Sequence, residues 1–170
     1  MNSSPAKDAQ AENAVKRQFC SFRAANRLYG ADILTVKEVT GETSFTAVHH
    51  AAPEVQGLVN IRGQISLVLD LRMLLGFDKQ PISPNSRVVL FKPDVGESFG
   101  FLVDSVGDVI SADENMIEWR KDGRKSSEAA ETSGKHERLE LGVCKLEKDL
   151  LVILNPAQAL ASLHSSSKIH

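Results

Sequence analysis

Two carboxylates follow predicted strands, and a carboxylate in such a place can take part in acid–base chemistry. Asp70 ends the stretch "VNIRGQISLVLD", and Asp104 follows "FGFLV". A general acid or base needs further polar groups close to the same reacting atom. Asp70 also stands directly before "LRMLLGF", where its carboxylate would accept hydrogen bonds from the free amides of a first helical turn. We favour this capping role for Asp70, and a small β-barrel enzyme that uses Asp104 or Asp70 is kept as an alternative.

The other groups that could bind a metal, a nucleotide or an acyl group lack the necessary setting. His49 and His50 are adjacent, so on a strand they would point to opposite faces. The segments "GLVNIRG" and "GESFG" lack the strand, glycine-rich turn and helix of a phosphate loop. No serine occupies a nucleophile-elbow motif. We therefore expect no metal, no cofactor and no catalytic residue, which makes partner binding the default function.

Composition narrows the class of partner. The net charge is −2, so no broad basic field is available for a nucleic-acid backbone, and one Trp and one Tyr leave little for base stacking. No apolar run approaches the length of a bilayer span, and "MNSSPAKDAQAENAVKR" has no apolar core of a signal peptide. A cytosolic protein is expected. Cys20 and Cys144 lie in apolar, strand-like segments, which favours buried thiols.

The stretch "VNIRGQISLVLDLR" has the clearest strand pattern in the chain. Apolar residues occupy the odd positions from Val59 to Leu71, except for Gly63, and polar residues occupy most of the even ones. This is the period of a strand with one buried face. Arg62 and Gly63 interrupt it, and Gly63 can supply the positive φ or close approach that a turn requires. A hairpin is predicted in which Arg62 leaves the apolar face and lies where a carboxylate can pair with it.

The rest of the chain reads as short strands with turn signals between them. We predict hairpins at "AANR" and at residues 147–149, a helical turn from Pro53 to Gly57, a short helix over 71–75 closed by Gly76, a capping box from Ser111 to Glu114, and a closing helix capped by Asn155 with Pro156 first. Roughly nine or ten strands favour a barrel or a sandwich, with two small sheets sharing one core. We expect one domain over 16–164, a disordered tail at 1–15, a flexible tail at 165–170 and a long polar loop at 120–138.

Several segments, in order, carry a resemblance to the CheW family of bacterial chemotaxis coupling proteins. "VQGLVNIRGQISLVLDLRMLLG" is similar to the family signature, with Asn-x-Arg-Gly, a second strand and Asp-Leu-Arg. "QFCSFRAANRLYGADILTVKEV" resembles the opening hairpin, "FGFLVDSVGDVI" the Val-Asp-x-Val element and "LELGVCKLEKDLLVILNPAQAL" the closing hairpin and helix. The likeness covers about residues 17 to 163. Ser66 stands where the family often has proline, and the 120–138 loop is long.

The resemblance implies a mostly β fold of two interlocked five-stranded SH3-like barrels, with short helices and a C-terminal helix. It implies a non-enzymatic adaptor that couples the cytoplasmic tip of chemoreceptors to the regulatory domain of a CheA-like histidine kinase. Such a protein would be cytoplasmic, recruited to receptor arrays, and in contact there with other CheW-like domains. An adaptor of a pathway for pili, gliding or development is the alternative within this class. The sequence does not identify the residues that contact the kinase.

The resemblance also implies a receptor-binding groove. It places the strand of Glu38 beside the Arg62 hairpin, so that Glu38 becomes the expected partner of the guanidinium. Apolar side chains would form the floor of a groove for a helix, and the ion pair would fix the orientation of that helix. The predicted receptor-binding residues are Ile33, Val36, Glu38, Val39 and Arg62. Gly57 and Gly63 are predicted to be structural turn residues rather than contacts.

Overall fold

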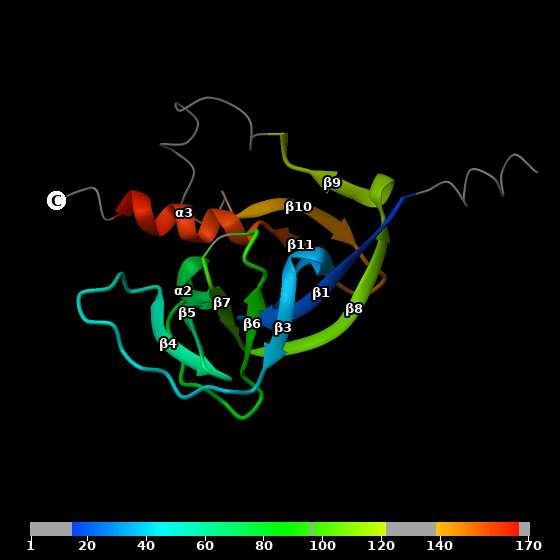
Figure 1. Cartoon of the computed structure of the whole chain (residues 1–170). Coiled ribbons are helices and arrows are strands. Elements are labelled where there is room, and N and C mark those ends of the chain that lie inside the picture. The colour runs from blue at the N-terminus through cyan, green and yellow to red at the C-terminus, as the bar shows by residue number, and fades with distance from the viewer. Residues whose placement is uncertain (1–14, 96, 122–138, 167–170) are drawn as a thin grey trace, which may run out of the picture.

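The computed structural model describes residues 15–95, 97–121 and 139–166, and in these ranges the chain forms eleven strands in two sheets (Figure 1). Sheet A has the order β8-β1-β2-β11-β10-β9, and sheet B has the order β3-β6-β7-β5-β4. The strands of sheet A are β1 (Lys16–Ala24), β2 (Arg27–Asp32), β8 (Ser105–Asp113), β9 (Ile117–Trp119), β10 (Glu140–Lys145) and β11 (Leu150–Leu154). The strands of sheet B are β3 (Val36–Thr40), β4 (Val55–Ile61), β5 (Gln64–Asp70), β6 (Arg87–Phe91) and β7 (Phe99–Val103).

The chain passes from sheet A to sheet B and back again. β1 and β2 belong to sheet A, the next five strands form sheet B, and β8 to β11 return to sheet A, where β11 pairs parallel with β2. β8 and β9 are the two edges of sheet A, although only the 3-10 turn η2 (Glu114–Met116) separates them in sequence. Sheet A must therefore curl. The predicted fold of two interlocked β subdomains is confirmed, with a sixth strand in sheet A.

The turn residues explain the two sharpest hairpins. Ala25 and Asn26 have φ of 52° and 65°, and they join β1 to β2 with Ala24 paired to Arg27. Arg62 and Gly63 have φ of 53° and 86° and join β4 to β5. Two successive residues with positive φ match the right-handed twist of the flanking strands. Both hairpins were predicted, but the positive φ of Arg62 was not.

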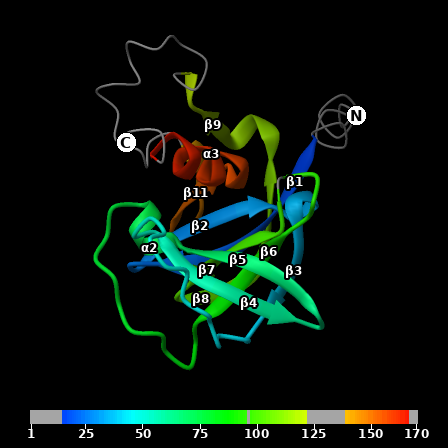
Figure 2. The same ribbon diagram turned by 60° about the vertical axis from the view of Figure 1, so that its left-hand side comes forward.

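Two helices flank the sheets. α2 (Leu71–Leu74) begins after its cap Asp70, and Gly76 follows it with a φ of 85°. α3 (Pro156–Ser166) begins at the predicted proline, which needs no amide donor in the first turn. Figure 2 shows α3 in the upper half of the view and β4 in the lower half, and Ala159 on α3 is fully buried in the core.

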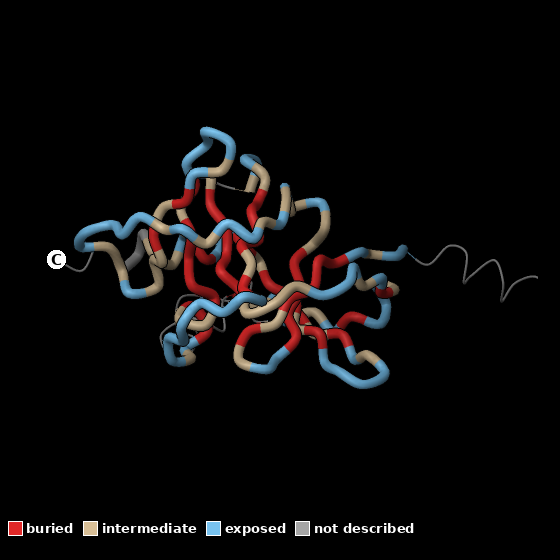
Figure 3. Tube along the Cα trace, turned by 90° about the horizontal axis from the view of Figure 1, so that it is seen from below, coloured by how far each residue is buried: buried red, intermediate tan, exposed pale blue. Residues whose placement is uncertain are grey.

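One core cluster joins the two sheets. Phe22 and Tyr29 of sheet A share it with Leu69, Phe91 and other residues of sheet B. The ring centroids of Phe91 lie 5.1 Å from those of Phe99 and 4.9 Å from those of Phe101, which is the usual spacing of packed aromatic pairs. Figure 3 shows the buried segments gathered in the middle of the molecule and the exposed ones in the loops. The predicted shared core is confirmed, and so is the burial of both cysteines.

One local prediction holds only in part, and one is wrong. A turn forms at residues 53–54, where the amide of Val55 donates to the carbonyl of Ala52 over 3.0 Å, but it does not continue to Gly57, because β4 begins at Val55 and pairs with β5. The capping box expected from Ser111 to Glu114 does not form, because β8 continues to pair with β1 past Ser111 as far as residue 113. In both cases a strand partner that is distant in sequence satisfies the backbone, and this outweighs the local helix signal.

Some predictions concern residues outside the described ranges. They are the disordered tail, apart from Val15, the loop at 120–138, apart from its first two residues, and the end of the C-terminal tail at 167–170. The tails and the domain boundaries of 16 and 164 stay predictions. Across the described ranges, none of the helices has the length and apolar character needed to span a membrane.

Candidate docking site

The two carboxylates that could have served catalysis both hold the backbone in place. Asp70 is 4% exposed, and its Oδ1 accepts a hydrogen bond of 2.9 Å from the amide of Arg72 at the start of α2. Burial raises the pKa of this carboxyl, although the hydrogen bonds that it accepts oppose the increase. Capping, which we favoured for Asp70, is confirmed.

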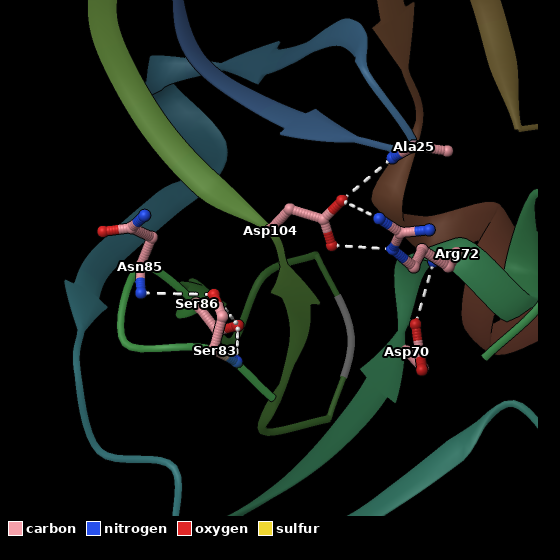
Figure 4. A network of polar contacts seen from close by, with 7 residues as sticks. All are labelled: Ala25, Asp70, Arg72, Ser83, Asn85, Ser86 and Asp104. Atoms are coloured by element: carbon pink, nitrogen blue, oxygen red, sulfur yellow. Dashed lines mark hydrogen bonds and ion pairs between the residues drawn. The ribbon is translucent and has the colours of Figure 1, made fainter. Parts of the chain in front are cut away.

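Asp104 forms a bidentate ion pair with Arg72 (Figure 4). Arg72 Nε and Nη2 donate to the two carboxylate oxygens over 2.8 and 2.6 Å, and the amide of Ala25 donates to Asp104 Oδ2 over 2.9 Å. These bonds raise the pKa of the Arg72 guanidinium. The cluster ties α2 to the β7–β8 junction and to the β1–β2 turn, so it links sheet B to sheet A.

The Arg62 hairpin reaches across sheet B to its opposite edge. Arg62 Nη2 lies 3.2 and 3.3 Å from the two carboxylate oxygens of Glu38 on β3. Next to this pair, Lys37 Nζ donates to Gln64 Oε1 over 2.7 Å. Because β3 and β4 are the two edges of sheet B, these contacts require the sheet to curl until the β4–β5 hairpin meets β3.

The two side chains of the Arg62–Glu38 pair differ in their exposure to solvent. The Arg62 side chain is 81% exposed and the Glu38 side chain 23%. An exposed ion pair contributes about 0–1 kcal/mol to stability, because water and salt screen it and both side chains lose freedom. The Arg62 guanidinium therefore remains mostly exposed to solvent although it is paired with Glu38.

The predicted apolar residues beside the pair fall into two groups. Ile33 and Val36 are partly buried and pack against the shared core. Val39 is 40% exposed on β3, one residue beyond Glu38. Of the three, Val39 is therefore the one that offers most of its surface to a partner.

Gly57 and Gly63 have different structural roles. Gly57 has a φ of 147°, and a Cβ built on it would lie 2.6 Å from the carbonyl oxygen of Thr46. This close approach permits the bridge in which Thr46 and Leu58 exchange two backbone hydrogen bonds of 2.8 Å. Gly63 has open space around it, and its φ of 86° is what the turn requires.

Sequence reasoning missed a highly exposed apolar side chain directly before β3. Leu34 is 72% exposed on the 3-10 turn η1 (Ile33–Thr35), directly before β3. Asp32 caps this turn, and its Oδ1 accepts from the amide of Leu34 over 2.9 Å. The signal was available in "ADILTV": an Asp that caps a turn before two consecutive apolar residues breaks the strand alternation, so both cannot be buried.

η1 also borders a hollow in the surface. Its volume is about 590 Å³, and it lies between the start of β1, η1 and the end of β8. The lining residues are Val15, Lys16, Arg17, Gln18, Asp32, Ile33, Leu34, Ser111 and Glu114. The hollow therefore adjoins the face of η1 and is lined by neither Asp70 nor Asp104.

The fold consists of two curled, interlocked sheets, and its surface carries a solvent-facing ion pair and exposed apolar side chains. These features are those of a mostly β binding domain. The chain belongs to the CheW-like domain family, whose model matches residues 18–164. The probable chemotaxis protein CheW of Rhizobium etli is 30% identical over 107 residues, which is 62% of this chain and 68% of that protein. The chemotaxis protein CheW of Klebsiella aerogenes is 32% identical over 108 residues, or 63% and 64% of the two chains.

A solved structure supports the same assignment. The crystal structure of the scaffolding protein TtCheW from Thermoanaerobacter tengcongensis superposes with a TM-score of 0.67 at 29% identity. The match covers 82% of this chain and 89% of that one. Both the fold and the family expected from the sequence motifs are thus confirmed.

Proposed function

We propose that this chain is a non-enzymatic adaptor that couples chemoreceptors to a CheA-type histidine kinase in bacterial chemotaxis arrays. Family membership and the chemotaxis names of its relatives support this function over a pathway for pili, gliding or development. Asp70 and Asp104 support a non-enzymatic role, because the backbone and Arg72 already engage both carboxylates. In this proposal the protein is cytoplasmic and joins the array through its partners.

The observation that carries the receptor contact is the Arg62–Glu38 pair. It lies where the two edges of sheet B meet, and the arginine is 81% exposed. A helix of the receptor tip would dock against Val39 and Leu34, whose apolar surface supplies most of the affinity. Arg62 would form an ion pair with a receptor carboxylate in addition to Glu38, or in its place. Because the pair contributes little to stability, exchanging its partner costs little.

We propose that the kinase binds exposed apolar residues at an end of one sheet, on a surface that does not include Arg62. Leu150 is 46% exposed at the end of sheet A that the β10–β11 turn forms, as such a contact would require. Chemical-shift mapping with the kinase regulatory domain tests this. Shifts confined to Glu38, Arg62 and their neighbours, with none at either end of the sheets, would contradict the proposal.

The receptor contact is tested by reversing the charge of Glu38. We expect Glu38→Lys to fold but to bind a soluble receptor fragment at least tenfold more weakly, which is about 1.4 kcal/mol. Glu147→Lys is the matched control, because it makes the same charge change at the exposed β10–β11 turn. Calorimetric titration of the three proteins decides the matter, and wild-type affinity for Glu38→Lys would refute the assigned face.

A further inference from the structure

The turn that carries Leu34 is fixed from three directions. Asp32 caps it at the amide of Leu34, and the hydroxyl of Thr35 donates to the carbonyl of Asp32 over 2.6 Å. The carbonyl of Thr35 in turn accepts from the amide of Lys92 over 2.9 Å. Leu34 itself is 72% exposed, so these polar contacts, and not the packing of its side chain, determine where it lies.

Asp32 is itself held by Arg17 on the neighbouring strand β1. Arg17 Nη2 donates to Asp32 Oδ2 over 2.7 Å, while the other oxygen of the same carboxylate caps η1. The two side chains are 32% and 23% exposed. One carboxylate thus contacts both η1 and β1, and among the residues that the structure describes Arg17 is the cation that pairs with it.

Arg17 is in turn oriented by aromatic rings. Its Cζ lies 4.9 Å from the ring centroid of Trp119 on β9 and 5.9 Å from that of Phe19. A guanidinium on an aromatic face gains cation–π attraction and loses rotational freedom. A continuous set of contacts therefore runs from Trp119 through Arg17 and Asp32 to η1.

We infer that Arg17 is a positioning residue for receptor docking, and that its stack on Trp119 fixes the turn that presents Leu34. The inference rests on the proposed function. An apolar anchor that is ordered before binding avoids the entropic cost of ordering it when the partner arrives. Arg17 touches no partner in this scheme, and it acts only through Asp32 and η1.

The test is a titration of receptor fragment into Arg17 variants. We expect Arg17→Gln to bind about threefold to tenfold more weakly than wild type. Arg17→Lys retains the charge toward Asp32 but loses the planar stack, so its affinity should lie between the two. Arg23→Gln is the matched control, since Arg23 lies on the same strand and makes an exposed ion pair of 2.8 Å with Asp149. This control should bind as wild type does.

A double-mutant cycle separates positioning from general damage to the fold. In a Leu34→Ala background, Arg17→Gln should cause no further loss of affinity, because the side chain that Arg17 positions is gone. Equal losses in both backgrounds would overturn the inference. Asp32→Asn is a second route, since the amide oxygen still caps Leu34 while the charge facing Arg17 is lost, and it should weaken binding as Arg17→Gln does.

Trp119 is the single tryptophan of the chain, so its fluorescence reports on this cluster alone. In the free protein its emission should change in Arg17→Gln, which removes the guanidinium from the ring, and should match that of wild type in Arg23→Gln. If wild type binds no fragment, the proposed function fails. If wild type binds and Glu38→Lys does not, but Arg17→Gln binds with full affinity, only the positioning role is refuted.

Discussion

Two of the arginine–carboxylate pairs that join distant segments, Arg72–Asp104 and Arg62–Glu38, differ in bond length, exposure and connectivity. Arg72 and Asp104 form two short bonds of 2.6 and 2.8 Å with side chains 22% and 34% exposed. Arg62 and Glu38 meet at 3.2 Å, with the arginine 81% exposed on a turn of positive φ. Asp104 of the first pair also accepts a hydrogen bond from the amide of Ala25, and this pair connects the two sheets. The second pair connects two edges of one sheet. The same residue types thus provide a structural link between sheets in one place and a mostly solvent-exposed cation in the other.

The largest expected effect is the loss of the link between the sheets. Arg72→Met keeps much of the side-chain volume but leaves Asp104 with the amide of Ala25 as its remaining donor among the contacts described. We expect a loss of about 2 kcal/mol in the free energy of unfolding, because a partly buried carboxylate loses its charged partner.

Urea denaturation measures this loss, and receptor affinity measured well below the unfolding transition should stay unchanged. A stability within about 0.5 kcal/mol of wild type would place this pair in the same class as Arg62–Glu38. A loss of affinity without a loss of stability would mean that Arg72–Asp104 acts in binding rather than in holding the fold together.

A smaller effect on stability, with the opposite functional consequence, is expected for the exposed pair. Arg62→Ala should change the free energy of unfolding by less than about 0.5 kcal/mol, since the guanidinium is screened by water. Its affinity for a receptor fragment should fall, because the proposed contact loses its cation. Denaturation and titration of both arginine variants should show a loss of stability in Arg72→Met and a loss of affinity in Arg62→Ala. A strongly destabilised Arg62→Ala would contradict this prediction.

The hairpins and the Asp70 cap could be predicted from the sequence because their causes are local. "AANR" and Arg62-Gly63 stand between alternating segments, and Asp70 precedes an apolar turn. Each of these features depends on residues a few positions apart, and the backbone conformations they favour are few. The same local reasoning failed at Ser111, where the pairing of β8 with β1 decided the structure.

The site was harder to predict than the fold. Spacing alone does not bring Glu38 to Arg62, because they lie on opposite edges of sheet B and meet only when the sheet curls. The family resemblance supplied that neighbourhood. The Arg17 cluster could not be found in this way, since it requires the register of β1 on β2 and the course of β9 together. The role of Arg72 with Asp104 was missed for the same reason.

The smallest effect is expected at Asp70, beside the structural pair. Burial raises the pKa of this carboxyl above its ordinary value of 3.8. At a pH between the unfolded and the folded pKa, the folded protein therefore keeps a proton that the unfolded chain has released. Stability from this group therefore falls as pH rises from the unfolded pKa to the raised one, and the penalty is complete above it. Asp70→Asn keeps an oxygen for the Arg72 amide and carries no charge to bury.

Asp70→Asn should accordingly equal or slightly exceed the wild type in stability at neutral pH and lose this advantage as the solution is acidified. Urea midpoints of both proteins from acid to neutral pH measure the difference, which should vary only across the window between the two pKa values. A difference independent of pH would mean that burial does not raise the carboxyl's pKa. A variant much less stable at neutral pH would mean that the charge itself, facing Arg72, holds α2 in place, and the structural side of the comparison would then include Asp70 as well as Asp104.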